Sequence, residues 1–272
     1  MILKYLIEEE IVLKNYLSSL FTSRMIKVLN NNENSYIVND QVVKNYYVLK
    51  PNDILQVVIP TILSDHIVPV NKPLDILFED NYLLILNKPN NIASIPTRMH
   101  YDKSLANFVM GYYKQKAYNF GIHFVNRLDF ATSGIIMIAK NPYIADLMKT
   151  KIIQKKYILK VYGQLRGNGI IKTNIEKAED SIIKRIATKG SKAITYYSVL
   201  ETHEDYSIVE AILATGKTHQ LRIHFKELGH PIIGDNLYNH DSGDLFLHST
   251  ELKFNHPITN EVINIKKKPN WL

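Results

Sequence analysis

Residues 123–134 read HFVNRLDFATSG and place one carboxylate, Asp129, in an otherwise apolar neighbourhood. The next residues, 135–139, are apolar and largely β-branched, which predicts a buried strand. A carboxylate beside a buried strand stays ionised only where a cation or several donors stabilise its charged form, and an opposite charge nearby lowers its pKa by roughly 1–3 units. Asp129 therefore needs a partner from elsewhere in the chain.

The best candidate partner lies in residues 215–229, TGKTHQLRIHFKELG. The pattern predicts a helix with Thr218 as N-cap and Gly229 at its end. Apolar residues recur at helical spacing on one face: Leu221, Phe225 and Leu228. Cationic residues recur on another face as a stripe: His219, Arg222 and Lys226. Arg222 is the natural counter-ion, so the sequence predicts an ion pair between Arg222 and Asp129.

Arg-Leu-Asp triplets that stand alone are mostly ordinary surface or ion-pair residues. Here the triplet belongs to an ordered set of short motifs over roughly the last 200 residues: Asn87-Lys88-Pro89, Arg127-Leu128-Asp129-x-x-Thr132-Ser133-Gly134, Lys156-Tyr157, Thr215-Gly216-Lys217-Thr218-His219-Gln220-Leu221-Arg222, Gly234-Asp235-x-x-Tyr238 and Leu247-His248. In this order the motifs resemble the RluA family of pseudouridine synthases. The resemblance implies an RNA uridine isomerase that needs no cofactor, because the reaction has no net redox change.

The resemblance also implies roles for the residues that match its motifs. Asp129 is the expected catalytic aspartate, acting either as nucleophile or as base. Arg127 is expected to displace the target base, because a planar guanidinium can stack and fill the vacated space; a structural ion pair is the alternative. Tyr157 is expected to stack on the flipped uracil. Together with Arg222, these residues form the predicted site.

The remaining candidates are cationic or replace a residue that is usual in the family. Lys88 either contacts phosphate or structures its loop. Lys217 stands where arginine is common and keeps the charge without the bidentate fork. His219 joins these two as a candidate RNA-binding residue. Asn126 replaces a frequent histidine, which argues against a histidine base at that position.

Composition narrows the class of protein. The 272 residues carry a formal net charge of +7, and a pI near 9.2 favours a polyanionic partner such as ribosomal or transfer RNA. The absence of cysteine excludes disulfides, thiolate nucleophiles and cysteine-ligated metals. The spacing of four residues in one loop fits no established metal-ligand pattern, so no metal is predicted: His240, Asp241, Asp244 and His248.

The N-terminal sequence argues for a cytoplasmic protein. Three consecutive acidic residues, 8–10, interrupt the first apolar stretch and fit neither a signal peptide nor a transit peptide. No apolar run approaches about 18 residues, so no membrane span is predicted. A monomer is the expected state.

The chain divides at a segment punctuated by prolines. The predicted parts are a module at residues 1–62, a linker at 63–73 and a main domain at 74–272. The module, with helices at 13–20 and 23–29 and strands at 36–38 and 54–59, resembles the alpha-L (ribosomal S4-like) RNA-binding motif. Its few cationic residues include Arg24 and Lys27, which are RNA-binding candidates in a module that either binds RNA weakly or only packs.

Strands outnumber helices in the main domain and do not alternate with them. Strands are predicted at 82–86, 135–139, 157–162, 193–200 and 207–214, and helices near 105–113 and 144–153. The pattern predicts an α+β fold with a mixed, largely antiparallel sheet, which the resemblance also implies as a pseudouridine synthase fold. Two competing functions are a catalytically silent RNA-binding or ribosome-assembly protein and a glycoside hydrolase. The first would have lost Asp129, Arg222 or Tyr157, all of which are present. The second normally needs two carboxylates.

Overall fold

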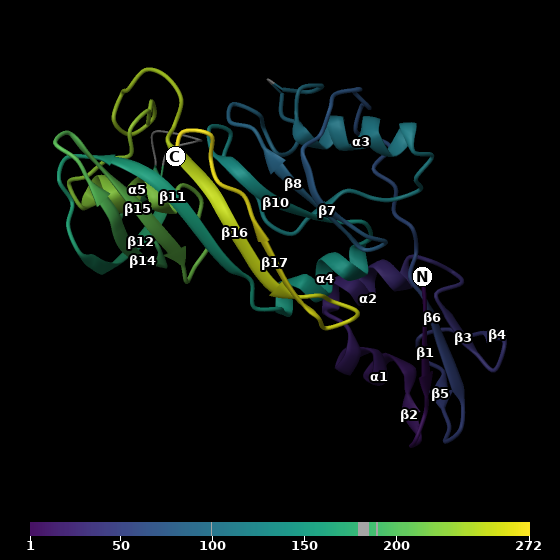
Figure 1. Ribbon diagram of the computed structural model, residues 1–272. Helices are drawn as coiled ribbons and strands as arrows, with labels where there is room; N and C mark the ends of the chain where they lie inside the picture. The colour runs from purple at the N-terminus through teal and green to yellow at the C-terminus, as the bar shows by residue number, and fades with distance from the viewer. Residues whose placement is uncertain (99, 179–184, 189) are drawn as a thin grey trace.

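The computed structural model describes residues 1–98, 100–178, 185–188 and 190–272. Figure 1 shows a small N-terminal module beside a larger unit, which is built around one long twisted sheet. In the described ranges, no helix is long and apolar enough to cross a bilayer.

The N-terminal module combines two short helices with a four-stranded sheet of order β1-β6-β3-β4. The helices are α1 (Leu13–Leu20) and α2 (Ser23–Asn30). The strands of this sheet are β1 (Ile2–Leu6), β3 (Tyr36–Val38), β4 (Gln41–Val42) and β6 (Ile54–Val58). A separate ladder joins β2 (Ile11–Val12) to β5 (Val48–Leu49). Both predicted helices are confirmed, whereas β1 was not predicted.

Two turns of the module depend on residues that accept a left-handed backbone. Asp40 has φ 67° and Asn52 has φ 70°, a region in which asparagine and aspartate are several-fold enriched. Asp40 and Asn52 thus form turns at which the backbone would otherwise favour glycine. The module buries its own apolar cluster, which includes Leu13, Leu17 and Leu55.

The larger unit contains an 11-stranded sheet. Its main order is β13-β12-β14-β15-β11-β16-β10-β8-β7, with β17 on β16 and β9 on β10. The strands are β7 (Ile76–Glu79), β8 (Leu83–Lys88), β9 (His123–Phe124), β10 (Ser133–Ala139), β11 (Gln154–Tyr162), β12 (Asn168–Lys177), β13 (Arg185–Ala187), β14 (Ser191–Thr202), β15 (Tyr206–Leu213), β16 (Leu247–Asn255) and β17 (Val262–Lys266). In the described part of the sheet, only β10 and β16 pair in parallel. The predicted α+β fold with a mixed, largely antiparallel sheet is confirmed.

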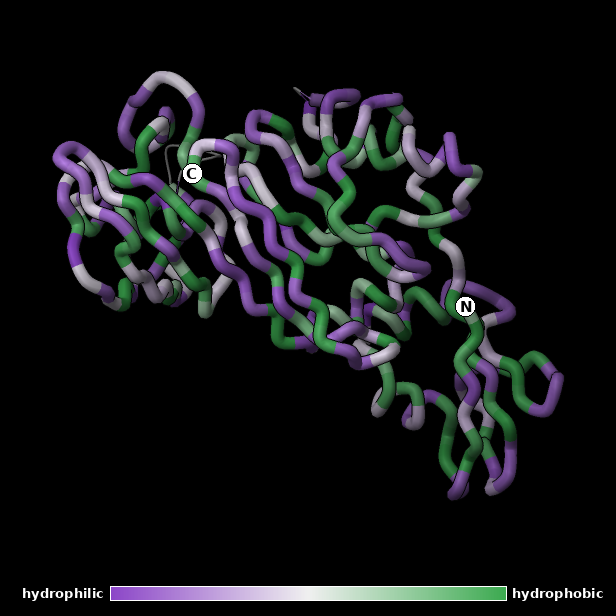
Figure 2. Tube along the Cα trace, in the orientation of Figure 1, coloured by the Kyte–Doolittle hydropathy of each residue, from purple (hydrophilic) through white to green (hydrophobic). Residues whose placement is uncertain are grey.

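Helices cover the sheet and explain its apolar central strands. The three helices are α3 (Leu105–Gln115), α4 (Pro142–Thr150) and α5 (Gln220–Glu227). Along β10, Ile136 and Ile138 join the cluster that contains α3, whereas Ile135 and Met137 join the cluster that contains α4. A strand that is buried on both faces reads as a continuous apolar run, as residues 135–139 do. In Figure 2, hydrophilic residues gather in the peripheral loops.

The start of β10 is held tightly against β16. Ser133 pairs with His248 and Gly134 with Ser249 in the parallel ladder, and the Ser133 hydroxyl lies 2.7 Å from His248 Nδ1. Gly134 has φ 109°, and a Cβ there would collide with the backbone of Ser249. Glycine is therefore required at this position. The junction fixes where the preceding loop, with Asp129, leaves the sheet.

The proline-punctuated segment lies against the larger unit. Residues 59–75 form no helix or strand, yet Ile67 is buried in the cluster around α3. Val70 N donates to Asn107 O at 2.9 Å, and Ile122 N donates to Ser64 Oγ at 3.1 Å. Residues 63–73 therefore form a strap that is anchored to the larger unit at Ser64, Ile67 and Val70. The predicted domain boundaries themselves stay a prediction.

The N-terminal module also contacts the larger unit directly. Thr22 Oγ1 donates to Asp146 Oδ2 at 2.6 Å, and the rings of Phe21 and Tyr143 lie 5.6 Å apart between centroids. Asp146 and Tyr143 belong to α4, and Figure 1 shows α2 beside this helix. The module is thus attached through both the strap and α4.

Candidate active site

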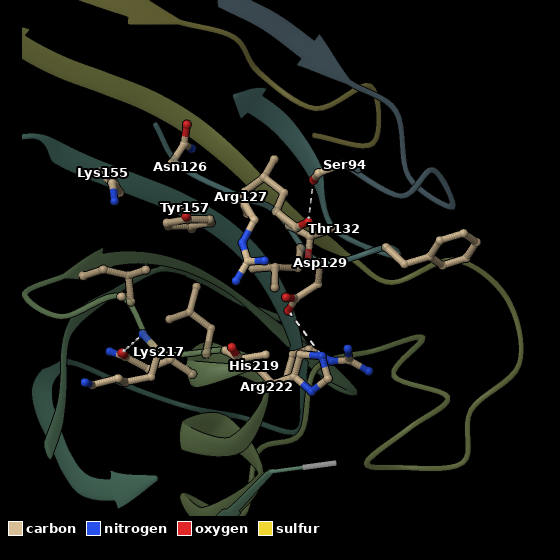
Figure 3. Close-up of a pocket in the computed structure, with 18 of the residues that line it drawn as sticks. Ser94, Asn126, Arg127, Asp129, Thr132, Lys155, Tyr157, Lys217, His219 and Arg222 are labelled. Carbon is tan, nitrogen blue, oxygen red and sulfur yellow. Dashed lines mark hydrogen bonds and ion pairs between the residues drawn. The ribbon is translucent and has the colours of Figure 1, made fainter. Parts of the chain in front are cut away.

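A cavity of about 630 Å³ opens beside the HFVNRLDFATSG stretch. Segments far apart in the sequence form its wall: residues 93–97, residues 124–132, the start of β11 and residues 213–222. Figure 3 shows side chains from these segments pointing toward a common space. The volume falls within the roughly 300–1,000 Å³ that is usual for small-molecule sites.

Asp129 lies at this cavity with 26% of its side chain exposed. Three hydrogen bonds fix the backbone around it. Ser94 Oγ donates to Leu128 O at 2.9 Å, Lys88 Nζ donates to Phe130 O at 3.2 Å, and Thr132 N donates to Asp129 O at 3.1 Å. The carboxylate is therefore held in place by its neighbours' backbone and stays accessible from the cavity.

Lys88 is fully buried beneath this loop. Its ammonium group also donates to Pro89 O at 2.9 Å and to Ile92 O at 2.8 Å. Burial lowers the pKa of Lys88 to about 7, although the negative charge of Asp129 acts in the opposite direction. A buried amine that is bound to three carbonyls cannot reach an RNA phosphate. Of the two expected roles, the structure supports the structuring of the loop and contradicts the phosphate contact.

His219 lines the cavity as a buried neighbour of Asp129, and its role in RNA binding stays a prediction. Its side chain is 8% exposed, and its Nε2 lies 3.8 Å from Asp129 Oδ2. Its Nδ1 lies 2.9 Å from the Tyr238 hydroxyl. Burial lowers the pKa of His219, and Asp129 opposes this shift. One of the dashed lines in Figure 3 joins His219 to Asp129.

The helix that follows begins later than the sequence predicts. Thr218 is not the N-cap; His219 occupies that position with φ 57°, and α5 begins at Gln220. The cause is the side chain of Gln220, whose Oε1 accepts from the Thr215 hydroxyl at 2.8 Å and from Lys217 N at 3.0 Å. These bonds fold the preceding turn back on the helix, which directs His219 toward the cavity.

Arg222 pairs with Asp235, which corrects the predicted pair with Asp129. Arg222 Nε donates to Asp235 Oδ2 at 2.9 Å and Nη2 donates to Oδ1 at 2.6 Å, in a bidentate arrangement. Their side chains are 7% and 1% exposed. Although burial opposes it, the bond to Asp235 raises the pKa of Arg222. The guanidinium also lies 5.1 Å from the centre of the Tyr238 ring.

The predicted cationic stripe does not form as a surface feature. His219 and Arg222 are buried, and only Lys226 of the three is exposed. Leu221 and Phe225 are buried as expected, whereas Leu228 is 36% exposed. Two of the three residues therefore lie inside the protein, where Arg222 pairs with Asp235 and His219 lies 3.8 Å from Asp129.

Tyr157 and Arg127 both line the cavity with Asp129. Tyr157 is 6% exposed, and burial together with the charge of Asp129 raises its pKa. The register of β11 against β16 shifts between Lys156 and Tyr157, and such bulges redirect a side chain. Arg127 is exposed, and in Figure 3 its guanidinium lies between Tyr157 and Asp129.

The other candidates lie farther from Asp129 or at the rim. Lys217 lines the cavity and is exposed. Arg24 and Lys27 are exposed on α2 of the N-terminal module and do not line this cavity. Among the described residues, no cluster of three or more acidic or histidine side chains could hold a metal.

Several residues that shape the site had no structural role assigned from the sequence. Asn126 Oδ1 accepts from Met137 N at 2.7 Å and thereby ties the loop to β10. Ser94 and Lys155 also line the cavity. Asp235 was visible only as a motif residue without a role. In the sequence, the signal of a structured turn was the glycine before it, Gly234. In the structure this glycine has φ 77°.

Comparison with known proteins identifies the family of the chain. The family model described as RNA pseudouridylate synthase matches residues 82–227, more than half of the chain. The chain belongs to this family. It is an RNA pseudouridine synthase, an isomerase, and the predicted resemblance to RluA-type enzymes is confirmed.

Curated relatives and solved structures agree with this family. The chain is 37% identical to the uncharacterized RNA pseudouridine synthase YjbO of Bacillus subtilis, over 82% of this chain and 83% of the relative. It is 31% identical to the dual-specificity RNA pseudouridine synthase RluA of Vibrio cholerae, over 72% and 82%. Human RNA Pseudouridylate Synthase Domain Containing 1 has the same fold, with a TM-score of 0.61 at 23% identity, over 74% of this chain and 85% of that chain.

Proposed function

We propose that this RNA pseudouridine synthase isomerises uridines in ribosomal RNA, with Asp129 as the reacting carboxylate. The observation that carries the site assignment is geometric. Asp129 lies at a cavity of about 630 Å³ with 26% of its side chain exposed, on a loop whose backbone is fixed by hydrogen bonds from Ser94 and Lys88. In the cavity wall, Asp129 is also the one carboxylate among the described residues.

The reaction requires one bond to break and another to form. The bond between the base nitrogen N1 and the sugar carbon C1′ breaks, the base turns, and C5 of the base bonds to C1′. The proton on C5 leaves and N1 gains one, so no electrons are exchanged with a partner. Asp129 serves either as nucleophile at the sugar or base or as the group that removes a proton, because a positioned carboxylate can perform each step.

The other site residues have supporting roles in this proposal. A uridine in a helix or stacked loop has to leave its stack before it can enter the cavity. Arg127 is exposed and planar, so it can occupy the vacated space. Tyr157 offers a ring on which the uracil can stack. Arg222 acts as a positioning residue, because its contacts are with Asp235 and Tyr238, and Tyr238 in turn contacts His219.

Ribosomal RNA is the proposed substrate because of two relatives. Ribosomal large subunit pseudouridine synthase D of Borreliella burgdorferi is 36% identical over 68% of this chain and 62% of that protein. Ribosomal large subunit pseudouridine synthase C of Rickettsia bellii is 34% identical over 71% and 67%. Transfer RNA stays the second candidate from the sequence, and the description of the Vibrio cholerae relative as dual-specificity is compatible with more than one RNA substrate in this family.

Pseudouridine mapping of total RNA tests the substrate. Cells that lack this gene should lose pseudouridine at one or a few ribosomal positions, and the wild-type gene should restore it while Asp129→Asn should not. Loss at transfer RNA positions alone would replace the ribosomal assignment with the second candidate. An unchanged map would leave only a silent RNA-binding or assembly role.

A further inference from the structure

An aromatic pair, Phe130 and the partly exposed His100, lies at the edge of the cavity. Phe130 directly follows Asp129, lines the cavity and is 43% exposed. Its ring stacks with the ring of His100, with centroids 5.0 Å apart and an interplanar angle of 20°. The loop around His100, residues 93–103, is called the His100 loop. Two further side chains from it are exposed, Ile95 at 40% and Tyr101 at 62%. A single exposed apolar residue needs no explanation, but a group of them beside an active-site cavity marks a binding surface.

The two rings are fixed relative to Asp129. The carbonyl of Phe130 accepts a hydrogen bond from the buried Lys88 ammonium at 3.2 Å. Two backbone hydrogen bonds tie His100 to Thr97: His100 N donates to Thr97 O at 3.1 Å, and Thr97 N donates to His100 O at 3.4 Å. A rigid aromatic surface of this kind loses little conformational entropy when a ligand stacks on it.

The charges around the pair suit a nucleic acid. Arg98 and Lys103 are exposed on the His100 loop, and Arg127 is exposed on the Asp129 loop. One exposed carboxylate, Asp102, lies among the described residues of the His100 loop. Cations that surround exposed rings are typical of single-strand binding surfaces, where the cations follow the backbone and the rings stack on bases.

We propose that Phe130 and His100 form a stacking platform for the nucleobase next to the uridine in the cavity. The inference rests on the proposed function, because flipping one uridine removes a stacking partner from each neighbouring base. A platform attached to the Asp129 loop replaces that partner. Stacking tolerates any base but is stronger for larger ring systems, so the platform favours a purine beside the target.

Fluorescence of 2-aminopurine tests the platform without any need for turnover, because this base analogue loses fluorescence when it stacks. The probes are two single-stranded RNAs of about nine nucleotides, a length within the usual single-strand site sizes. Each has one central uridine, with 2-aminopurine on its 5′ side in one RNA and on its 3′ side in the other. At protein concentrations that saturate fluorescence anisotropy, the wild-type protein should quench one of the two probes.

Matched variants separate stacking from general loss of apolar surface. Phe130→Leu keeps an apolar side chain but removes the ring, and it should lose the quenching. Phe130→Trp should keep it. His100→Ala provides a second test that does not alter the Asp129 loop. Tyr196→Ala removes an exposed ring, 44% exposed on β14 and outside the cavity wall, and should change nothing.

Turnover on RNA gives the second readout. Phe130→Leu should raise KM by roughly 5- to 150-fold, the factor that corresponds to the loss of one stacked base, with a smaller change in kcat. The platform is wrong if the wild-type protein binds neither probe, or if it binds them and quenches neither. It is also wrong if Phe130→Leu and His100→Ala both quench the probe as the wild-type protein does and both have the wild-type KM. Quenching that depends on Phe130 in a protein without isomerase activity would support the platform and refute the proposed reaction.

Discussion

The pair between Arg222 and Asp235 should dominate the stability of the region behind the cavity. Both side chains are nearly inaccessible, at 7% and 1% exposure, and two hydrogen bonds join them at 2.9 and 2.6 Å. Removing one partner of such a pair leaves the other buried without compensation, at a cost of about 3–5 kcal/mol. Asp235 Oδ1 also accepts from Leu237 N and Tyr238 N, each at 3.1 Å. We therefore expect Asp235→Ala to cost at least as much as Arg222→Ala.

Urea denaturation and thermal melting measure this cost. At this chain length 1 kcal/mol corresponds to roughly 2 °C in Tm, so each single variant should melt about 6–10 °C below the wild-type protein. The double variant Arg222→Met with Asp235→Leu should be more stable than either alanine variant, because it leaves no unpaired charge. Arg222→Lys should restore only part of the stability, because lysine lacks the bidentate fork.

A double-mutant cycle decides between the two possible partners of Arg222. The free energy of unfolding should show strong coupling between Arg222 and Asp235. It should show weak coupling between Arg222 and Asp129, whose side chain is 26% exposed. Asp129→Asn is the matched control, and alone it should leave Tm nearly unchanged. The argument is refuted if Arg222→Ala melts like the wild-type protein, or if the coupling to Asp129 is the larger of the two.

Three further predictions concern activity, pH and the N-terminal module. Asp129→Asn should abolish isomerisation while RNA binding changes little, because the amide keeps the shape and removes the charge; turnover in pure protein, free of deamidated material, would contradict the assignment. Because the pKa of Lys88 falls from 10.5 to about 7 on folding, the unfolded state binds more protons between these values. The free energy of unfolding of the wild-type protein, measured by urea titration, should therefore rise relative to that of Lys88→Met from pH 7 to pH 10. If the two free energies change with pH in parallel, the lowered pKa of Lys88 is refuted. Deletion of residues 1–62 should leave a domain that is folded by circular dichroism and active, with weaker and less salt-dependent RNA binding; an unfolded product would place the module in the core.

The strands and helices with a strong local pattern could be predicted from the sequence. Residues 135–139 form part of β10 because an apolar, β-branched run suits a strand that is buried on both faces. The helix predicted at 144–153 exists, but it begins at Pro142 because Asn141 Oδ1 accepts from Ile144 N at 2.9 Å. β12 was missed, since much of it is exposed and its sequence, NGIIKTNIEK, lacks a continuous apolar run.

The partners inside the site could not be predicted, because they depend on tertiary contacts. Two carboxylates, Asp129 and Asp235, were available to Arg222, and the sequence offered no measure of which one the fold brings closer. The left-handed backbone of His219 follows from a side-chain bond of Gln220 five residues back to Thr215. Local propensity does not contain such bonds, so the N-cap was placed one residue too early.

The double attachment of the N-terminal module has a consequence for substrate selection. The strap lies against α3, and Thr22 and Phe21 bind α4, so the module cannot swing freely on a tether. An RNA that contacts both α2 and the cavity must therefore span a distance that the protein sets in advance. If RNA docks on α2, the module would act as a ruler: it would accept a uridine at the correct spacing from a docked helix and reject the same sequence one turn farther away, without reading any base between them.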